Sequence, residues 1–332
     1  MTKLLKVHGS GNDFFLLDQT LLSRQISETE LKELAQHLCD RKKGLHGGAD
    51  GLLLVTESDD QAQAKMRVIN ADGSEASMCG NGIRTVARYV ARKNHLSTAS
   101  SFLIETMYAD LRVKSAPSLA NNVPAFDAEI SPVSFAAEKI GMHIGKSRLL
   151  DEIVPEISSY LHFSAVAVPN PHLISFVDQK KLQGDTLPEI AAYLNGENPY
   201  FPNGVNVSFV NVLSENQIFV RTYERGVGLT NACGTAMSAS SLIYVIQTLG
   251  RAGLERELKV YNPGGMVKTV VHQRENGKYW ISLIGNATIT ASVDLDISSA
   301  LKSQFTGAKW KETNEGQAYD CFASLIRSQI KQ

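Results

Sequence analysis

Two cysteines with matching surroundings are the residues of this chain best placed to do chemistry. Cys79 and Cys233 are each followed by a glycine, and each stands between a strand-like segment and an apolar, helix-like segment. With a constant offset of 233 − 79 = 154 residues, the segment 67–80 aligns without a gap with the segment 221–234. The sequence therefore predicts a chain built twice on one plan, with a cysteine at the same point in each copy.

The position of these cysteines indicates acid and base chemistry. A thiol in water has a pKa of about 8.5, and the start of a helix favours the thiolate through unpaired N–H groups and the helix dipole. A glycine directly after the cysteine lets backbone amides approach an anion such as a carboxylate. Two such helix starts facing each other would hold one carboxylate between two thiols, which suits a racemase or epimerase.

Such a pair must hold one thiolate and one thiol at the same time, so its titration is coupled and needs a neighbour that biases it. His172 and Glu224 are the candidates.

Other interpretations of the cysteines remain open. Cys39 and Cys321 fit small buried hydrophobic residues. No two cysteines have the spacing of a structural zinc site, so no metal is expected. Two activated thiols could also form a redox-sensing disulfide. A non-catalytic amino-acid-binding module is disfavoured, because binding alone does not require two thiols.

Composition narrows the class of protein. The 332 residues are 43% hydrophobic, which is enough for two domains of ordinary size. The net charge of −1 and the lack of long Lys or Arg runs argue against a nucleic-acid partner. The first residues lack the pattern of a secretory signal, and no stretch has membrane-spanning length. Four widely spaced cysteines suit a reducing compartment, so we expect a cytoplasmic protein.

The pattern predicts two α/β units. In the first half we expect strands at 2–7, 13–18 and 51–55, and a helix that begins at the capping box of Ser27 and Glu30 and ends near Asp40. The helix after Cys79 is predicted to be amphipathic, with apolar residues at helical spacing and its arginines (Arg84, Arg88 and Arg92) on another face. By contrast, 232–250 has no charged residue, which predicts a helix buried almost all round and closed by Gly250.

The second half is expected to repeat the plan, with strands at 165–168, 173–178 and 207–212 and a strand pair that ends at 285 and at 287–291. Prolines and weak periodicity place the domain boundary within 115–135. We expect one domain at 1–130, carrying Cys79 and rejoined by 290–332, and another at 131–289, carrying Cys233. From 297 onward the chain is expected to form a charged helical region.

Seven motifs, in order and at plausible spacing, resemble those of the diaminopimelate epimerase family. The resemblance runs from about Lys6 to Gly285. The motifs are His8-Gly-Ser-Gly-Asn-Asp-Phe14, Gly48-Ala-Asp-Gly51, Asn70-Ala-Asp-Gly-Ser-Glu75, Met78-Cys-Gly-Asn-Gly82, Asn170-Pro-His172, Tyr223-Glu-Arg-Gly226 and Ala232-Cys-Gly-Thr235.

The resemblance implies a mixed α/β fold of two pseudo-symmetric domains, each a mixed sheet or barrel wrapped around a central helix, with the substrate in the cleft between them. It implies epimerisation of LL-diaminopimelate to meso-diaminopimelate without pyridoxal phosphate or another cofactor, in lysine and peptidoglycan precursor synthesis. It also implies a homodimer. The implied acid and base residues are Cys79 and Cys233.

The resemblance also implies the surrounding site. His172 and Glu224 would tune the two thiols. The backbone amides that would hold the reacting carboxylate belong to Gly80, Asn81, Gly234 and Thr235. The substrate's amino groups and distal carboxylate would be bound by Asn12, Asn70, Asn170, Asn206, Glu224 and Arg225.

The chain departs from some family members in two places. Gly51 stands where some members have a glutamine that touches substrate, and an extended segment follows about Ala291. The alternative is another two-cysteine racemase of the same fold, acting on proline, hydroxyproline or histidine. Arg225 beside Glu224, together with four amide side chains, favours a substrate with a second charged end.

Overall fold

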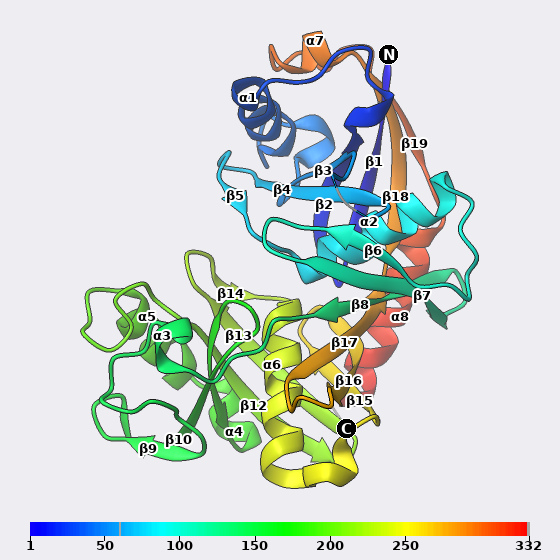
Figure 1. The fold of residues 1–332 in the computed structure, drawn as a ribbon. Helices are drawn as coiled ribbons and strands as arrows, with labels where there is room; N and C mark the ends of the chain where they lie inside the picture. The colour runs from blue at the N-terminus through cyan, green and yellow to red at the C-terminus, as the bar shows by residue number, and fades with distance from the viewer. Residues whose placement is uncertain (60, 331–332) are drawn as a thin grey trace. The chain divides into compact units, whose positions relative to one another are not determined.

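The computed structural model describes residues 1–59 and 61–330, and its internal contacts divide the chain into two units (Figure 1). Unit 1 comprises Met1–Ala128 and Ile284–Gln332, and unit 2 comprises Glu129–Leu283. Within the described ranges, no helix combines the length and the apolar character that crossing a bilayer requires.

Unit 1 is a mixed sheet with the order β19-β18-β1-β2-β3-β4-β6-β7-β8, and β5 pairs with β4. The pairs β2/β3 and β4/β6 are parallel and the others are antiparallel. The strands are β1 (Thr2–Gly9), β2 (Asn12–Asp18), β3 (Gly51–Thr56), β4 (Ala64–Asn70), β5 (Glu75–Ala76), β6 (Phe102–Glu105), β7 (Asp110–Ala120), β8 (Val123–Ile130), β18 (Thr288–Leu295) and β19 (Lys309–Glu312).

The sheet of unit 1 encloses one helix and carries another on its opposite face. The helix α2 (Gly80–Lys93) packs against β1 to β4 and β7, and α1 (Glu28–Cys39) packs against β2 to β4. The capping box of Ser27 and Glu30 is present, so the predicted start of α1 is confirmed. The remaining helical segments are η1 (Gln19–Leu21), η2 (Leu45–Gly47), α7 (Ile297–Ala300) and α8 (Glu315–Ile330).

The predicted amphipathic pattern of α2 is present, but its arginine face is buried at two of the three positions. Arg84 is fully buried and Arg88 is 8% exposed, so both lie inside the unit rather than on a solvated face. Their burial is possible because backbone carbonyls of Gly80, Asn286 and Ala287 accept hydrogen bonds from the guanidinium groups. The periodicity that indicates one apolar face is therefore compatible with a helix buried almost all round.

Unit 2 has a second mixed sheet, with the order β9-β10-β11-β12-β13-β15-β16, and β14 pairs with β13. Here β11/β12 and β13/β15 are the parallel pairs. The strands are β9 (Glu152–Val154), β10 (Ser158–Ala167), β11 (Pro171–Phe176), β12 (Asn206–Ser214), β13 (Gln217–Glu224), β14 (Gly228–Thr230), β15 (Glu257–Asn262), β16 (Gly265–Gln273) and β17 (Tyr279–Asn286), the last of which runs across the division of the units.

The helix α6 (Gly234–Tyr244) is buried along its whole length and packs against β10 to β13, β15 and β16. It continues into a π-helical turn, η3 (Val245–Leu249), and Gly250 ends that turn with a left-handed φ of 57°. The predicted buried helix and its glycine cap are confirmed. The other helical segments are α3 (Ala137–Ile140), α4 (Gln179–Gln183), α5 (Thr186–Asn195) and η4 (Gly250–Gly253).

The two units share one topology. Each contains an antiparallel pair, a parallel partner, a further antiparallel strand and then the central helix, after which the chain returns as a parallel strand. Cys79 is the N-cap of α2 and Cys233 is the N-cap of α6. The prediction of a mixed α/β chain built twice is therefore confirmed.

Strands occupy most of the proline-containing stretch 115–135, where irregular composition suggested a boundary. β7 and β8 form a hairpin there, and Pro117 falls where their register shifts between Ala116 and Ala120. A proline is tolerated at such an irregularity because no regular ladder bond is lost.

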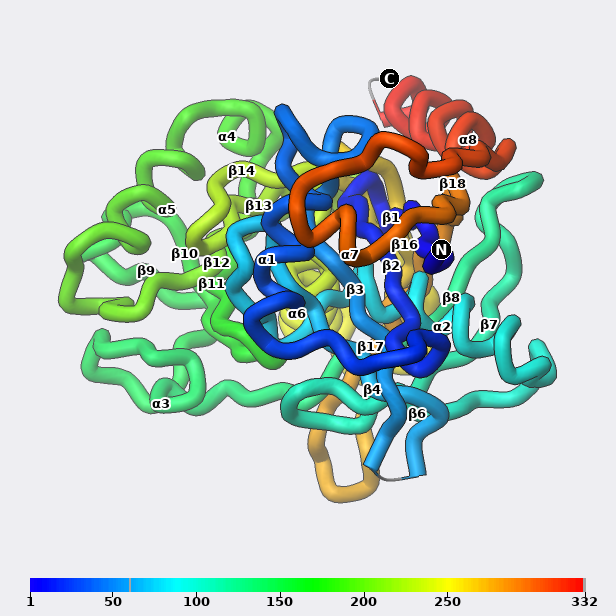
Figure 2. The backbone as a smooth tube through the Cα atoms, turned by 90° about the horizontal axis from the view of Figure 1, so that it is seen from above, coloured from blue at the N-terminus to red at the C-terminus, as the bar shows by residue number. Residues whose placement is uncertain are grey.

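The region from 297 onward contains a strand as well as helices. β19 pairs with β18, and α8 also packs on β18 (Figure 2). The C-terminal segment therefore extends the sheet of unit 1 and covers part of it.

Candidate active site

Cys79 has an extended backbone, with φ −138° and ψ 111°, at the point where α2 begins. The N–H of Gly82 donates to its Sγ at 3.3 Å, and the thiol lies 3.6 Å from Oδ1 of Asn12. The amide of Asn81 donates to the same Asn12 oxygen at 3.3 Å. Unit 1 therefore groups Cys79 with Asn12 and the first turn of its central helix.

Asp50 fixes the orientation of Asn12. Its Oδ2 accepts from Nδ2 of Asn12 at 2.6 Å and from the backbone of Asp13 at 3.0 Å, and Arg41 donates to its other oxygen at 2.5 Å. Because Nδ2 of Asn12 is engaged by the carboxylate, its Oδ1 is the atom directed to the thiol.

The other residues expected around Cys79 occupy two places. Gly80 and Asn81 form the first turn of α2, where backbone N–H groups have no acceptor within the helix. Asn70 ends β4, and its amide donates to Ser74 in the following turn at 3.0 Å. The structure thus places Asn70 against its own turn.

Cys233 occupies a drier environment than Cys79. It is 6% exposed, and its Sγ lies 3.4 Å from the hydroxyl of Thr235. Burial, followed by the negative charge of Glu224, raises the pKa of the Cys233 thiol well above its ordinary value. Cys233 is therefore a thiol at neutral pH.

His172 is fully buried in β11, and burial together with the nearby Arg225 lowers its pKa to about 3. Its Nε2 lies 3.0 Å from Oδ1 of Asn170 and acts as the donor, because the amide oxygen can only accept. The neutral ring then has its lone pair on Nδ1, which has no hydrogen-bond partner among the described residues. At neutral pH, His172 acts as a neutral group.

Asn206 and Arg225 lie at adjacent strand ends. Oδ1 of Asn206 accepts from the backbone N–H of Arg225 at 2.8 Å, and the guanidinium donates to the carbonyl of Asn203 at 2.8 Å. Asn206 is the register partner of His172 across the parallel strands β11 and β12. Unit 2 therefore groups Asn206 with Arg225 and His172 with Asn170.

Sequence reasoning missed three residues beside these groups. Asp50 lies within a quoted motif, and only the fold shows that it orients Asn12. Arg84 was predicted only to lie on another face from the apolar residues of its helix, and the fold shows that it lies beneath the Cys79 turn. Asn286, which accepts from the backbone of Ser10 at 2.7 Å, has no distinguishing pattern in the sequence.

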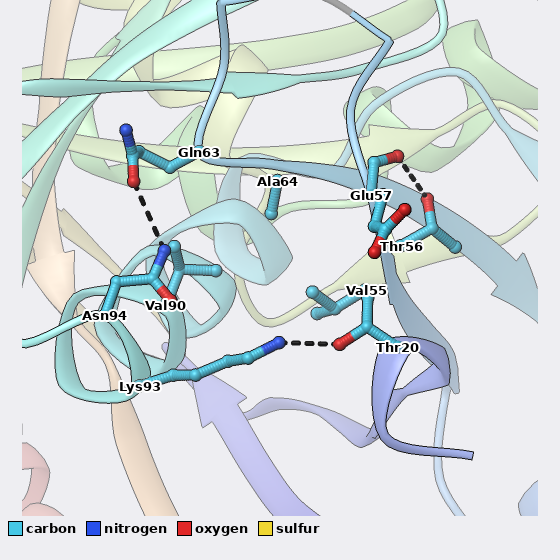
Figure 3. A pocket seen from close by; sticks show the side chains of 9 residues that line it. All are labelled: Thr20, Val55, Thr56, Glu57, Gln63, Ala64, Val90, Lys93 and Asn94. Atoms are coloured by element: carbon cyan, nitrogen blue, oxygen red, sulfur yellow. Dashed lines mark hydrogen bonds between the residues drawn. The ribbon is translucent and has the colours of Figure 1, made fainter. Parts of the chain in front are cut away.

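A hollow of about 100 Å³ in unit 1 lies away from the thiol (Figure 3). Lys93 and Asn94 line it at the C-terminal end of α2, whereas Cys79 caps the other end. At 1.5 Å per residue, the 14-residue helix separates the two by about 20 Å. This hollow is therefore not part of the thiol site.

Comparisons with known proteins agree on the family. The diaminopimelate epimerase family model matches residues 4–116 and 164–290. A diaminopimelate epimerase of Ligilactobacillus salivarius is 59% identical over 98% of this chain and 99% of its own, and one of Enterococcus faecalis is 56% identical over 97% of each.

Solved structures support the fold. A Bacillus anthracis phenazine biosynthesis protein of the PhzF family superposes with a TM-score of 0.61 over 89% of this chain and 99% of its own, at 17% identity. At that identity, the similarity concerns the fold alone. From the family model and the two close relatives, we conclude that this chain belongs to the diaminopimelate epimerase family.

Proposed function

We propose that this chain interconverts LL-diaminopimelate and meso-diaminopimelate without pyridoxal phosphate, as a step in lysine and peptidoglycan precursor synthesis. The observation that carries the proposal is the near full-length identity of 59% to a diaminopimelate epimerase. The two helices capped by cysteine supply residues suited to this reaction.

Two thiols in different environments suit a two-base mechanism. Cys79 accepts the N–H of Gly82 at its sulfur, a contact that favours negative charge there. Cys233, buried and near Glu224, holds its proton. In this mechanism the Cys79 thiolate removes the α-proton of one stereoisomer, and the Cys233 thiol delivers its proton to the opposite face of the same carbon. The reverse reaction exchanges the two roles.

Removal of an α-proton without an electron-sink cofactor places negative charge on the substrate carboxylate. Backbone N–H groups at a helix start stabilise such charge, since they are already oriented and the dipole has the right sign. We assign this role to Gly80 and Asn81 in α2 and to Gly234 and Thr235 in α6.

The remaining groups fit a substrate with two amino acid ends. Oδ1 of Asn12 is an acceptor suited to an ammonium group, and Asn70, Asn170 and Asn206 are further amides of the proposed site. Arg225 would bind the distal carboxylate. Glu224 would contact an ammonium group and also keep Cys233 protonated. His172, neutral and buried, would bind or orient through Nδ1.

A substrate panel tests this function. Purified, reduced protein with no added cofactor is incubated separately with LL-diaminopimelate, L-proline, trans-4-hydroxy-L-proline and L-histidine, and the stereoisomers are separated by chiral chromatography. We expect meso-diaminopimelate to form and the three other substrates to remain unchanged. Turnover of proline, hydroxyproline or histidine in place of diaminopimelate would instead establish the alternative racemase.

The location and assembly of the protein are also proposed. The two thiols of the proposed site must stay reduced, which suits the cytoplasm. A homodimer is proposed from the family resemblance. Light scattering coupled to size-exclusion chromatography tests the dimer, which predicts twice the chain mass of 36.2 kDa.

A further inference from the structure

Arg84 is a fully buried cation whose hydrogen-bond partners are all neutral. Its guanidinium donates to the carbonyl of Gly80 at 2.8 Å, to Oδ1 of Asn81 at 3.0 Å and to the carbonyl of Asn286 at 3.3 Å. In the ranges 1–59 and 61–330, no carboxylate forms a salt bridge with it. Burying a charge without an opposite charge beside it lowers the free energy of unfolding, so the presence of Arg84 at this position requires an explanation.

Two glycines leave just enough room for this guanidinium. A Cβ atom at Gly9 in β1 would lie 2.9 Å from Nη2 of Arg84, and one at Gly285 in β17 would lie 2.8 Å from the same atom. Neither position has a φ that requires glycine. The close approach of the guanidinium explains Gly285, whereas at Gly9 a Cβ atom would meet both the guanidinium and, also at 2.9 Å, the carbonyl oxygen of Asn81.

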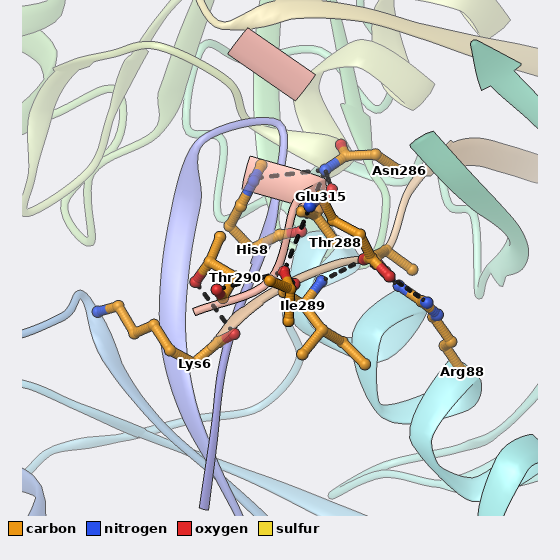
Figure 4. Close-up of polar contacts among 10 residues, drawn as sticks. Lys6, His8, Arg88, Asn286, Thr288, Ile289, Thr290 and Glu315 are labelled. Atoms are coloured by element: carbon orange, nitrogen blue, oxygen red, sulfur yellow. Dashed lines mark hydrogen bonds and ion pairs between the residues drawn. The ribbon is translucent and has the colours of Figure 1, made fainter. Parts of the chain in front are cut away.

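Arg88, one turn later in α2, provides a contrast. Its guanidinium forms a bidentate ion pair with Glu315 at 2.6 and 2.7 Å and donates to the carbonyl of Ala287 at 2.7 Å (Figure 4). Glu315, at the start of α8, thus neutralises Arg88. Two arginines buried on the same helix therefore differ in one respect, which is that a carboxylate pairs with Arg88 only.

The ionisable groups that interact electrostatically with Arg84 are Cys79, His8 and Tyr319. Burial lowers the pKa of His8 to about 4, so its ring is neutral at pH 7. Burial raises the pKa of Tyr319 to about 12, so its hydroxyl is also neutral. The Cys79 thiol is the one group of the three that can be an anion near neutral pH.

Arg84 itself remains charged. Burial lowers its pKa to about 10, and the interaction with Cys79 acts in the opposite direction. Because a pairwise charge interaction is reciprocal, a cation stabilised by the Cys79 thiolate stabilises that thiolate to the same extent. The bond to Gly80, the residue after Cys79, also ties the guanidinium to the turn that begins the helix.

We propose that Arg84 is a positioning residue that acts through Cys79: its buried charge holds Cys79 in the thiolate state, and its hydrogen bonds fix the turn formed by Gly80 and Asn81. This inference rests on the proposed function only in that the thiolate serves as the base. The ionisation of Cys79 can be measured without substrate.

The test is the pH dependence of Cys79 alkylation by iodoacetamide, read at the individual cysteine by mass spectrometry. Wild type is compared with Arg84→Met, Arg84→Lys and the control Arg88→Met/Glu315→Gln, which removes a buried arginine together with its partner. We expect the midpoint for Cys79 to rise by about one pH unit in Arg84→Met. In Arg84→Lys, which keeps the positive charge, the midpoint for Cys79 should lie close to the wild-type value. The control should keep the wild-type midpoint.

A catalytic readout accompanies alkylation. In Arg84→Met, kcat at pH 7 should fall about tenfold and recover as the pH rises, because a larger fraction of Cys79 ionises. A merely structural role would instead lower kcat by the same factor at every pH. Circular dichroism melting establishes that each variant folds. If Arg84→Met does not fold, Arg84→Gln, which keeps one donor, is measured in the same way.

The results separate this inference from the proposed function. A raised alkylation midpoint in a protein that does not turn over diaminopimelate would support the role of Arg84 and contradict the function. If the wild type is active and folded Arg84→Met has the wild-type alkylation midpoint at Cys79, the role of Arg84 is overturned and the proposed function stands.

Discussion

The backbone nitrogen of Gly82 lies 3.3 Å from Sγ of Cys79 and donates its hydrogen to the sulfur. A Cβ atom at Gly82 would lie 3.5 Å from that sulfur and 2.8 Å from Cδ2 of Leu53. Gly82 therefore supplies the donor and leaves room for Leu53 beside the thiol. Because Leu53 is fully buried and 3.5 Å from the sulfur is an ordinary van der Waals distance, a methyl group here would first displace the core residue and not the thiol.

Replacing Gly82 with alanine should lower kcat about tenfold, because relief of the overlap with Leu53 shifts the turn that holds the thiol and a small displacement of a reacting group is costly. The melting temperature should also fall, because the added methyl group overpacks the core at Leu53. Gly184→Ala is the matched control, since its nearest atoms would lie 3.5 Å away and its φ is ordinary. Equal kcat values in the two variants would show that the space beside Cys79 does not matter.

Glu224→Gln should lower the pKa of Cys233, because the charge of Glu224 is one cause that raises it. Burial still keeps most of Cys233 protonated at neutral pH, so we expect kcat to fall less than about tenfold at pH 7 and to fall further as the pH rises, because a thiolate cannot act as the acid. Site-resolved alkylation should show a lower midpoint for Cys233. Glu189→Gln, at an exposed position of unit 2, is the control. An unchanged Cys233 midpoint would contradict this role.

The depressed pKa of His172 predicts how stability depends on pH. Between about pH 6.5 and 3, His172 binds a proton in the unfolded chain but not in the folded one. The contribution of neutral His172 to the free energy of unfolding is therefore complete above pH 6.5 and is lost as the pH falls. The loss approaches about 1.4 kcal/mol per pH unit within that window.

Urea unfolding at pH 7.5 and pH 5 checks this prediction. Wild type should lose stability at pH 5, and His172→Gln should lose less. His8, with a pKa of about 4, still contributes to the dependence in the variant. The same pH dependence in both proteins would mean that His172 is not held neutral by burial.

The ion pair of Arg88 and Glu315 should stabilise the fold rather than the chemistry. Glu315→Gln leaves the buried Arg88 without its anion and should lower the free energy of unfolding by about 3 kcal/mol. Arg88→Met/Glu315→Gln should lose less, because no charge is left unpaired. Glu215→Gln, from an exposed pair with Arg256, should have little effect. Urea titration measures all three, and equal losses in the single and double variants would contradict the buried pair.

Local sequence signals predicted the elements that position the thiols. The offset between Cys79 and Cys233 indicated the repeated topology, and the uncharged segment after Cys233 indicated a buried helix. These features depend on neighbouring residues and on periodicity, both of which a sequence displays directly.

The surroundings of Arg84 could not be predicted in the same way. An arginine spaced with Arg88 and Arg92 is ordinarily solvated, and its burial depends on a carbonyl of Asn286, 202 residues away. Likewise, Glu315 reaches Arg88 only because α8 packs on β18. Hydrogen-bond partners that distant segments contribute leave no local pattern in the sequence. The hydrogen bonds of Arg84 beneath Cys79 can therefore be seen only in the fold.

The most direct test of the two-thiol account is proton NMR of LL-diaminopimelate in D2O with reduced protein, Cys79→Ser and Cys233→Ser, and no pyridoxal phosphate. We predict that early meso product carries deuterium at the inverted carbon, that remaining LL substrate keeps its proton, and that both variants lose most of the activity. No exchange from folded, reduced protein, or exchange that survives both substitutions, would contradict the account.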